Sequence, residues 1–253
     1  MSDRVRRIKA CLNGRRTPAD HPAVPITPDQ LAAAAAGAVA AGAEAVHLHP
    51  RAPDGRESLR ASDVGAAVGA VRAACPGTPV GVTTGLWAAA DVWTRRDEVI
   101  GWADLELSHR PDFASVNLSE DGWQELVVIL ADAGIRAEAG IWSVADVEAA
   151  AGFMPPGGWL RIMVEIAHVT AEAATMRADE ILDILYAARM TAPILLHGEN
   201  ESCWPLVAHA GRLGLATRIG LEDVLTGPDG RDVTGNADLV RLGLVEWTAA
   251  PSG

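Results

Sequence analysis

Short apolar runs alternate along the chain with longer stretches in which apolar residues recur at helical spacing. The runs contain few polar residues, which is typical of strands that are covered on both faces of a sheet. They lie at residues 8–12, 45–48, 80–83, 113–116, 135–138, 160–164, 193–196 and 217–221. Strands that alternate with helices in this way predict a parallel sheet wrapped by helices.

The stretches between these runs carry helix signals. Thr27-Pro28-Asp29 combines an N-cap residue, a proline at the first helical position and a carboxylate in the first turn. A helix is therefore expected from Pro28 to Ala41, and Gly42 ends it. Further helices are expected at 61–74, 121–133, 144–151, 178–189, 203–213 and 236–244, and residues 93–108 are expected to be partly helical.

The number of these units decides between two α/β architectures. Eight strand–helix units follow one another without a linker, and after the first strand stands Gly14 alone rather than a Gly-rich phosphate loop. A doubly wound sheet has fewer strands and uses such a loop. The sequence therefore predicts one (β/α)8 TIM barrel, a single domain that spans residues 1–253.

Charge and composition exclude two classes of partner. The formal net charge is −12, and a nucleic-acid-binding protein would need a basic surface, so no nucleic-acid partner is expected. No apolar run approaches the roughly 20 residues that span a bilayer, and the N-terminus has no apolar signal segment. We therefore expect no membrane partner and a cytoplasmic protein. Cys11, Cys75 and Cys203 form no Cys-x-x-Cys pair, which fits thiols in a reducing compartment.

The strongest chemical signal is Val46-His47-Leu48-His49-Pro50. Alternate side chains of a strand share one face, so His47 and His49 should point the same way, about 6–7 Å apart along the chain. Pro50 ends the strand, which puts both histidines at its C-terminal end, where barrel active sites lie. Two buried imidazoles at that separation can chelate one metal ion. The alternative is a pair of core histidines, each satisfied by a neighbour.

A second signal follows the last apolar run, in Thr217-Arg218-Ile219-Gly220-Leu221-Glu222-Asp223. The last strand of a closed barrel lies one place away from the second strand, so a carboxylate there can reach a metal held by the two histidines. Adjacent acidic residues at a turn point in different directions, so one of Glu222 and Asp223 can be a ligand and the other a base. Arg218 lies an even number of positions before Glu222, so both face the interior in a regular strand. The alternative is an N-cap and first-turn acidic pair of a following helix.

Polar groups also end other predicted strands. Thr83-Thr84-Gly85 ends the third strand and can hold an oxyanion or a carboxylate through hydroxyl and backbone N–H groups. The alternative is an ordinary strand end, in which the β-branched residues bind no ligand. Ser115 and Asn117 share a face at the end of the fourth strand. Glu138 is expected to end the fifth, and His197 ends the seventh as a candidate third imidazole. Their repetition at strand ends indicates a substrate site.

Together these segments resemble the β-keto acid cleavage enzymes. The resemblance rests on Asn13-Gly14, Pro22-Ala23-Val24-Pro25-Ile26-Thr27-Pro28, Val46-His47-Leu48-His49-Pro50-Arg51 with Asp54-Gly55-Arg56, Ala114-Ser115-Val116-Asn117, and Arg218-Ile219-Gly220-Leu221-Glu222-Asp223. It runs in order from about Ile8 to Leu244, and Asn236-Ala237-Asp238-Leu239-Val240 fits the last helix of the family. The two-histidine block and the Gly-Leu-Glu-Asp block, with the Pro-rich segment upstream, are specific in combination.

The resemblance implies Zn²⁺, or another divalent metal, bound by His47, His49 and Glu222. It implies a reaction between a small-molecule β-keto acid and acetyl-CoA that gives acetoacetate and a new acyl-CoA. Asp223 and Arg218 would act as a polar pair on the reacting group, with Thr83 as the hydroxyl of the third strand. The candidate substrate-binding residues are Asn13, Arg16, Thr84, Gly85, Ser115, Asn117 and Glu138. Members of the family are often tetramers, so a homo-oligomer is expected.

Three segments depart from the family pattern. Gly14-Arg15-Arg16-Thr17 stands where the type member has an acidic residue that meets a substrate amino group, so an anionic or neutral substrate tail is expected. A Gly-rich loop is replaced by Glu165-Ile166-Ala167-His168-Val169-Thr170, and a Gly-x-Gly-Arg segment by Gly198-Glu199-Asn200-Glu201. Both loops could contact CoA, and the second adds negative charge where a phosphate would need positive charge.

Three functions remain open from the sequence. The leading one is a metal-dependent acyltransferase that cleaves a C–C bond of a β-keto acid with an acyl-CoA. The second is a metal-dependent lyase or hydrolase that acts on a keto acid without CoA. The third is a non-catalytic barrel that binds a small acid, but Asp223, Arg218 and Thr83 beside the ligands argue against it, because a sensor needs no base.

Overall fold

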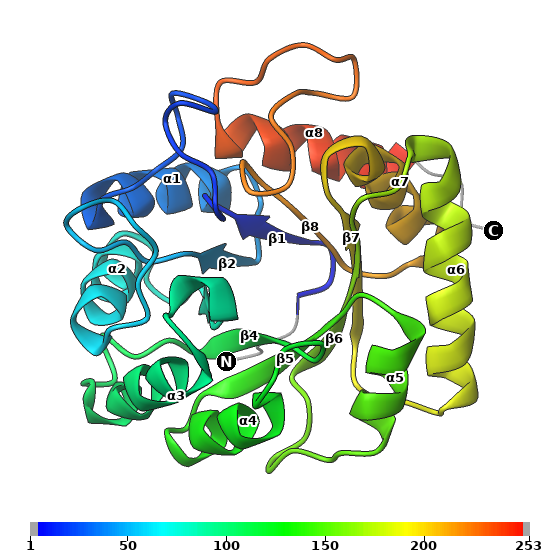
Figure 1. Cartoon of the computed structure of the whole chain (residues 1–253). Coiled ribbons are helices and arrows are strands. Elements are labelled where there is room, and N and C mark those ends of the chain that lie inside the picture. The colour runs from blue at the N-terminus through cyan, green and yellow to red at the C-terminus, as the bar shows by residue number, and fades with distance from the viewer. Residues whose placement is uncertain (1–4, 250–253) are drawn as a thin grey trace.

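The computed structural model describes residues 5–249, and there eight parallel strands form a ring that helices enclose (Figure 1). The strands are β1 (Ile8–Cys11), β2 (Ala45–Leu48), β3 (Val80–Thr83), β4 (Phe113–Asn117), β5 (Arg136–Ile141), β6 (Arg161–Ile166), β7 (Ile194–Gly198) and β8 (Thr217–Ile219). The helices are α1 (Pro28–Ala40), α2 (Ala61–Ala74), α3 (Val92–Ile100), α4 (Trp123–Asp132), α5 (Val144–Ala151), α6 (Ala171–Ala187), α7 (Cys203–Leu213) and α8 (Asn236–Ala249). The predicted (β/α)8 TIM barrel is confirmed.

β7 and β8 close the ring. Hydrogen-bonded neighbours follow the order β7-β6-β5-β4-β3-β2-β1-β8. Between the two ends of this series, Leu195 pairs with Ala216 in an isolated parallel bridge, and Leu196 N donates to Ala216 O at 2.9 Å. Thr217 Oγ1 adds a hydrogen bond of 2.8 Å to Leu196 O. Because β1 lies between β8 and β2, residues that follow β8 are one strand away from the histidines of β2.

The helical cover follows from the capping and spacing in the sequence. At α1, Thr27 accepts from Gln30 N and the Gln30 side chain returns to the Thr27 backbone, a capping box with proline at the first turn. The face that α1 buries carries Leu31, Ala35 and Ala38 at helical spacing. Among the helices between residues 5 and 249, none has both the length and the apolar character needed to cross a bilayer.

Alternate strand residues point into the barrel and stack in layers. Phe113 and Leu195 belong to an apolar layer near the start of the strands. Gly81 makes room for that layer, because a Cβ at this position would lie 2.1 Å from the Phe113 ring. A buried ion pair between Lys9 and Glu138 forms the next layer. The polar residues that end the strands therefore sit on a filled interior rather than over a pore.

Several element boundaries differ from the sequence prediction, among them the end of β5 and the start of α6. β5 runs to Ile141, because Gly140 pairs with β4 and Ile141 pairs with β6. Glu138 therefore lies within β5, facing the interior, and the prediction that it ends the strand is wrong. α6 begins at Ala171 rather than at residue 178, since residues 171–177 contain good helix formers and no glycine or proline.

Candidate metal centre and active site

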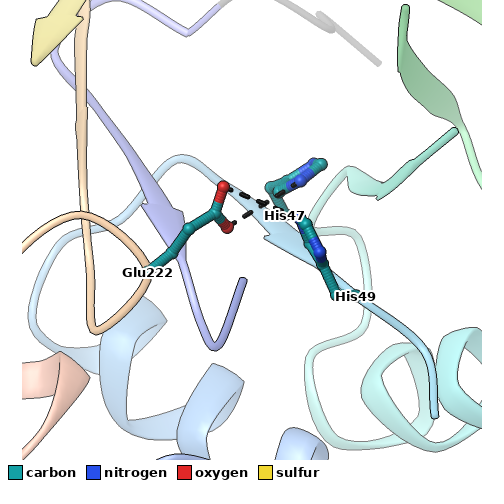
Figure 2. Close-up of side chains that lie close together, drawn as sticks. All are labelled: His47, His49 and Glu222. Atoms are coloured by element: carbon teal, nitrogen blue, oxygen red, sulfur yellow. Dashed lines mark ion pairs between the residues drawn. The ribbon is translucent and has the colours of Figure 1, made fainter. Parts of the chain in front are cut away.

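β2 delivers two histidines to the C-terminal mouth of the barrel (Figure 2). His47 lies in the strand, and His49 follows its last residue, Leu48. Their ring centroids are 5.2 Å apart and the ring planes cross at 81°. Both residues are buried, with 1% and 4% of their surface exposed. The two imidazoles thus share one face, as the alternation of strand residues predicts.

Glu222 reaches the histidines from the turn that follows β8. Its Oε2 lies 3.9 Å from His47 Nε2, and its Oε1 lies 3.6 Å from His49 Nε2 (Figure 2). One nitrogen or oxygen atom from each of the three residues lies within 4.8 Å of the others. Gly14 packs against this carboxylate with φ +55°, and a Cβ there would lie 2.3 Å from Glu222 Cγ. A side chain at Gly14 would therefore displace Glu222.

The three side chains fit a divalent cation. Imidazole nitrogens with one carboxylate oxygen are a common ligand set of catalytic zinc and leave a position for substrate. His47 Nδ1 and Glu222 Oε2 are buried and have no hydrogen-bond partner among the residues described. Buried polar atoms are normally satisfied, so orphaned atoms on two residues of one cluster indicate a site for an ion.

Further contacts hold His49 in place. Its Nδ1 is hydrogen-bonded to the carboxylate of Glu57, which leaves Nε2 facing Glu222. Asn13 Oδ1 accepts from His49 N and Asn13 Nδ2 donates to His49 O, each at 2.9 Å. Metal-binding histidines commonly have such a carboxylate partner. Asn13, predicted to bind substrate, thus lies where its amide positions His49.

The electrostatics of the trio favour a bound cation. Burial lowers the pKa of His47 well below its usual value. Burial acts in the same direction on His49, but the carboxylates of Glu222 and Glu57 outweigh it and raise the pKa of His49 to about 9. Burial alone would raise the pKa of Glu222, yet Arg218 and the two histidines hold it well below the usual range. Neutral His47 and ionised Glu222 are the forms that bind a metal, and at His49 a metal would replace a proton.

Arg218 and Asp223 form a pair beside the trio. Arg218 Nη2 lies 2.8 Å from Asp223 Oδ1 and 3.0 Å from Glu222 Oε1. Asp223 is completely buried, and its Oδ2 has no hydrogen-bond partner among residues 5–249. Burial raises the pKa of Asp223 well above its usual value, although Arg218 opposes the shift. A carboxylate with a raised pKa and a free oxygen next to a metal site is suited to proton transfer.

A cavity of about 430 Å³ opens above these residues. His47, His49, Glu222 and Arg218 form part of its wall, and the predicted residues Thr83, Ser115, Asn117 and Arg16 line it as well. Thr83 Oγ1 accepts from Gly85 N at 3.0 Å, so its hydroxyl hydrogen stays free to donate. The cavity therefore offers hydroxyl, amide and guanidinium donors around one carboxylate-and-imidazole centre.

Two other predicted substrate-binding residues lie deeper. Thr84 is buried and donates its hydroxyl to Ser115 O at 2.7 Å. Glu138 pairs with Lys9, and its Oε2 lies 3.4 Å from Arg161 Nε. Burial would raise the pKa of Glu138, but the charges of Lys9 and Arg161 lower it to about 2. Glu138 thus lies below the cavity as part of the interior charge layer.

The comparison with known proteins agrees with this geometry. The family model for beta-keto acid cleavage enzymes matches residues 7–244. The chain belongs to this family.

Solved structures share the barrel. ObcA superposes with a TM-score of 0.68 at 20% identity, both in a binary complex with oxaloacetate and in its apo form. The match covers 89% of this chain but only 63% and 62% of those ObcA chains, so the chain spans less than two thirds of that protein. A type I 3-dehydroquinate dehydratase from Clostridium difficile superposes with a TM-score of 0.64 at 11% identity. The match covers 97% of this chain and 94% of the dehydratase chain. At such identities the likeness concerns the fold alone.

The barrel mouth also has carboxylates at the ends of β6 and β7. Glu165 Oε2 lies 3.0 Å from His197 Nε2, so His197 faces a carboxylate. Burial lowers the pKa of the His197 imidazole well below its usual value. Burial also raises the pKa of Glu165. Burial and the neighbouring charge of Glu165 raise the pKa of Glu199 to about 7. Glu165 and Glu199 both line the cavity, which the sequence pattern did not predict.

The opposite rim, after β1 and β3, is basic and aromatic. Arg16 Nε donates to Glu222 O at 3.2 Å, and its Nη2 donates to Asn200 Oδ1 at 2.7 Å. The guanidinium of Arg15 lies 5.6 Å from the centre of the Trp87 ring. Trp87 in turn stacks on His49, with centroids 6.4 Å apart and planes 19° from parallel. In this family member, the segment with two arginines therefore borders the candidate metal centre directly.

Proposed function

We propose that this chain catalyses a metal-dependent acyl transfer in which a β-keto acid and acetyl-CoA give acetoacetate and a new acyl-CoA. Membership of the family supports β-keto acid cleavage. The observation that carries the metal-dependent part is the convergence of His47, His49 and Glu222 beside the Arg218–Asp223 pair.

The metal ligands in this proposal are His47, His49 and Glu222. Zn²⁺ or another divalent cation held there would supply Lewis-acid polarisation of the keto oxygen and neutralise the substrate carboxylate. Glu57 and Asn13 keep His49 oriented toward that point. The ligands therefore fix where the reacting end of the substrate lies.

Asp223 is the residue to which we assign proton transfer. Its raised pKa and its unpaired Oδ2 suit a general base, since a higher pKa makes a carboxylate a stronger base. Asp223 takes a proton from the α-carbon of the β-keto acid, and that carbon attacks the thioester carbonyl of acetyl-CoA while coenzyme A leaves as the thiolate. The thiolate then attacks the original β-carbonyl carbon, and the bond from that carbon to the α-carbon breaks. Asp223 returns its proton to the α-carbon of the departing acetoacetate.

Arg218, Thr83 and Ser115 assist these steps. Arg218 lines the cavity and holds Asp223 through its guanidinium, so it orients the base. Thr83 and Ser115 lie on the same wall and would donate hydrogen bonds to the alkoxide that develops at each attacked carbonyl. Preorganised donors aimed at such a charge commonly supply a large part of the rate enhancement.

The substrate tail is proposed to be neutral or anionic. Arg15 and Arg16 both line the cavity, and Arg15 has no carboxylate within ion-pair distance among the described residues. An ammonium group on the tail would meet like charge there. The ratio of turnover rates for neutral or anionic β-keto acids and for 3-keto-5-aminohexanoate tests this. Equal rates for the amine would contradict it.

Metal analysis and a substrate panel together test the proposed activity. Protein purified without chelator should carry about one divalent ion per chain, and Glu222→Ala should lose both the ion and turnover. A panel of β-keto acids is then incubated with and without acetyl-CoA, and thioesters are followed. New acyl-CoA and acetoacetate in equal amounts are the expected result.

The two alternatives give different outcomes. If the keto acid disappears without thioester formation, the chain is a CoA-independent lyase or hydrolase. If keto acids bind in equilibrium experiments and no product forms under any condition, the barrel is a binding protein. If the purified protein contains no divalent ion and gains no activity from one, the metal-dependent proposal fails.

A further inference from the structure

A second groove opens beside the catalytic cavity and shares a wall with it. Its volume is about 720 Å³. It lies between the segment after β1, the turn that follows β2 and the segment after β3. Arg15 and Trp87 line both the groove and the catalytic cavity, so the two spaces lie side by side at these side chains. A long ligand that crosses these two side chains could therefore reach both spaces.

Four arginines line this groove, in a chain whose net charge is −12. We call it the arginine groove after Arg15, Arg51, Arg56 and Arg60. Arg15 has no ion pair among the described residues, and Arg60 Nε reaches Glu98 only at 3.9 Å. Arg56 pairs with its neighbour Asp54, but both lie on the surface. Exposed ion pairs are weak, so an anion can compete with Asp54 and Glu98 for Arg56 and Arg60 and can bind Arg15 directly.

The acidic residues of the groove, Asp54, Glu57 and Glu98, are fewer than its arginines. Glu57 is already bonded to the imidazole of His49, and its Oε1 also accepts from Trp87 Nε1 at 3.4 Å. Arg51 holds the backbone by donating to Gly14 O and to Arg16 O, so it keeps the segment that carries Arg15 in place. The groove therefore combines a fixed framework with one unpaired guanidinium, that of Arg15, and two guanidinium groups in weak surface ion pairs, those of Arg56 and Arg60.

The opposite rim could not hold the same ligand. Glu165 and Glu199 line the cavity there and already crowd Arg218, whose Nη2 is 3.8 Å from one and 3.9 Å from the other. A phosphate on that rim would be repelled by both groups when they are ionised, and it would compete with them for Arg218. The charge distribution around the mouth therefore leaves the side of β1–β3 as the favourable place for an anionic group.

We propose that the arginine groove binds the phosphorylated nucleotide end of the acyl-CoA co-substrate. This inference rests on the acyl transfer proposed above. Acyl-CoA carries a 3′-phosphate and a pyrophosphate at one end, and guanidinium groups recognise phosphates through paired, charge-assisted hydrogen bonds. The pantetheine arm then runs past Arg15 and Trp87, which border both spaces, and brings the thioester into the catalytic cavity.

The double variant Arg56→Gln/Arg60→Gln tests the groove without touching the catalytic cavity. Both side chains are highly exposed, at 86% and 71%, so the fold should tolerate the change. The KM for acetyl-CoA should rise by about tenfold or more, the factor that corresponds to one charge-assisted hydrogen bond. The KM for the keto acid and the metal content should stay unchanged. Arg231→Gln is the matched control, since Arg231 is 88% exposed and lies outside the groove.

A truncated thioester separates the groove from general effects of charge. Acetyl-pantetheine lacks the phosphates and the nucleotide, so the wild type and the double variant should use it equally poorly. If acetyl-CoA keeps its KM in the double variant, or if the wild type uses acetyl-pantetheine as well as acetyl-CoA, the groove has no such role while the acyl transfer stands. If the wild type forms no thioester at all, both proposals fall, and this result differs from the other two.

Discussion

The two halves of the barrel mouth satisfy their polar groups in opposite ways. In the histidine half, which we define by Asn13, His47, His49 and Glu57, the contacts are specific and local, and one histidine is fixed at its ring and at its backbone. In the carboxylate half, one guanidinium serves four acidic side chains. The Nη2 atom of Arg218 lies within 4 Å of Glu165, Glu199, Glu222 and Asp223.

This difference separates two tasks of one site. A fixed imidazole keeps its free nitrogen directed at a cation, so the histidine half is built to hold a metal. A shortage of positive charge in a buried place disfavours ionisation, so the pKa values of Asp223, Glu165 and Glu199 are raised. Glu199, whose pKa is about 7, can accept and release a proton near neutral pH. The carboxylate half is therefore suited to proton transfer.

Asp223→Asn is the sharpest way to separate the halves. The amide keeps the shape of the side chain but cannot act as a base, so kcat should fall by about 10²- to 10⁴-fold. The bound metal should remain, because none of the three ligands changes. Steady-state kinetics and metal analysis on the same preparation measure both effects.

The control for this variant is Asp232→Asn, an exposed aspartate in the loop before α8. It should keep full activity. Undiminished turnover in Asp223→Asn would remove the assignment of the base, and loss of the metal would show that the two halves are not separable.

Glu57→Gln tests the histidine half with a smaller expected effect. The amide oxygen can still accept from His49 Nδ1, but the negative charge that strengthens the imidazole as a ligand is gone. Metal affinity should fall by about 10- to 100-fold, as is usual for the partner of a ligating histidine. Competition with a chromophoric chelator measures the affinity, and kcat at saturating metal should stay close to that of the wild type.

Asp54→Asn is its matched control, because Asp54 lies in the same turn and pairs only with Arg56 in the ion pairs of the described chain. An unchanged metal affinity in Glu57→Gln would mean that the carboxylate is not part of the metal site. A loss of kcat at saturating metal would give Glu57 a role in the histidine half other than holding the ligand.

The histidine half was largely predictable from the sequence, because its key spacing is local. His47 and His49 lie two residues apart in a strand that a proline ends, so their common face follows from strand geometry alone. Glu222 could be placed because a barrel fixes which strands are neighbours. Glu57 was missed, since it reaches His49 only through a turn in which Arg51 pairs with Glu57. Nothing in the hydrophobic pattern marks such a turn.

The carboxylate half was harder to predict for a different reason. Glu165 lies near the end of β6 and Glu199 follows β7, in segments that depart from the family pattern, and their meeting with Arg218 depends on how the ends of β6, β7 and β8 come together. The error at Glu138 has a local cause, because Ala139-Gly140-Ile141 extends β5 with small and apolar residues that also suit a loop or a helix start.

The smallest expected effect concerns the stability of the carboxylate half, and Glu199→Gln measures it. The pKa of Glu199 is raised from 4.5 to about 7, so the folded protein binds more protons than the unfolded chain between these values. The free energy of unfolding contributed by this group is therefore fully present below pH 4.5 and is lost as the pH rises through 7. The variant has no such loss, so at pH 8 it should be more stable than the wild type by about 1 to 3 kcal/mol, with the difference vanishing toward pH 4.5.

Denaturant unfolding with chelator present measures this difference in the free energy of unfolding at each pH. The exposed Glu201→Gln removes the same formal charge and is the control. A difference that does not grow with pH would mean that Glu199 is not short of positive charge, and the contrast between the two halves would then rest on Asp223 and Glu165 alone.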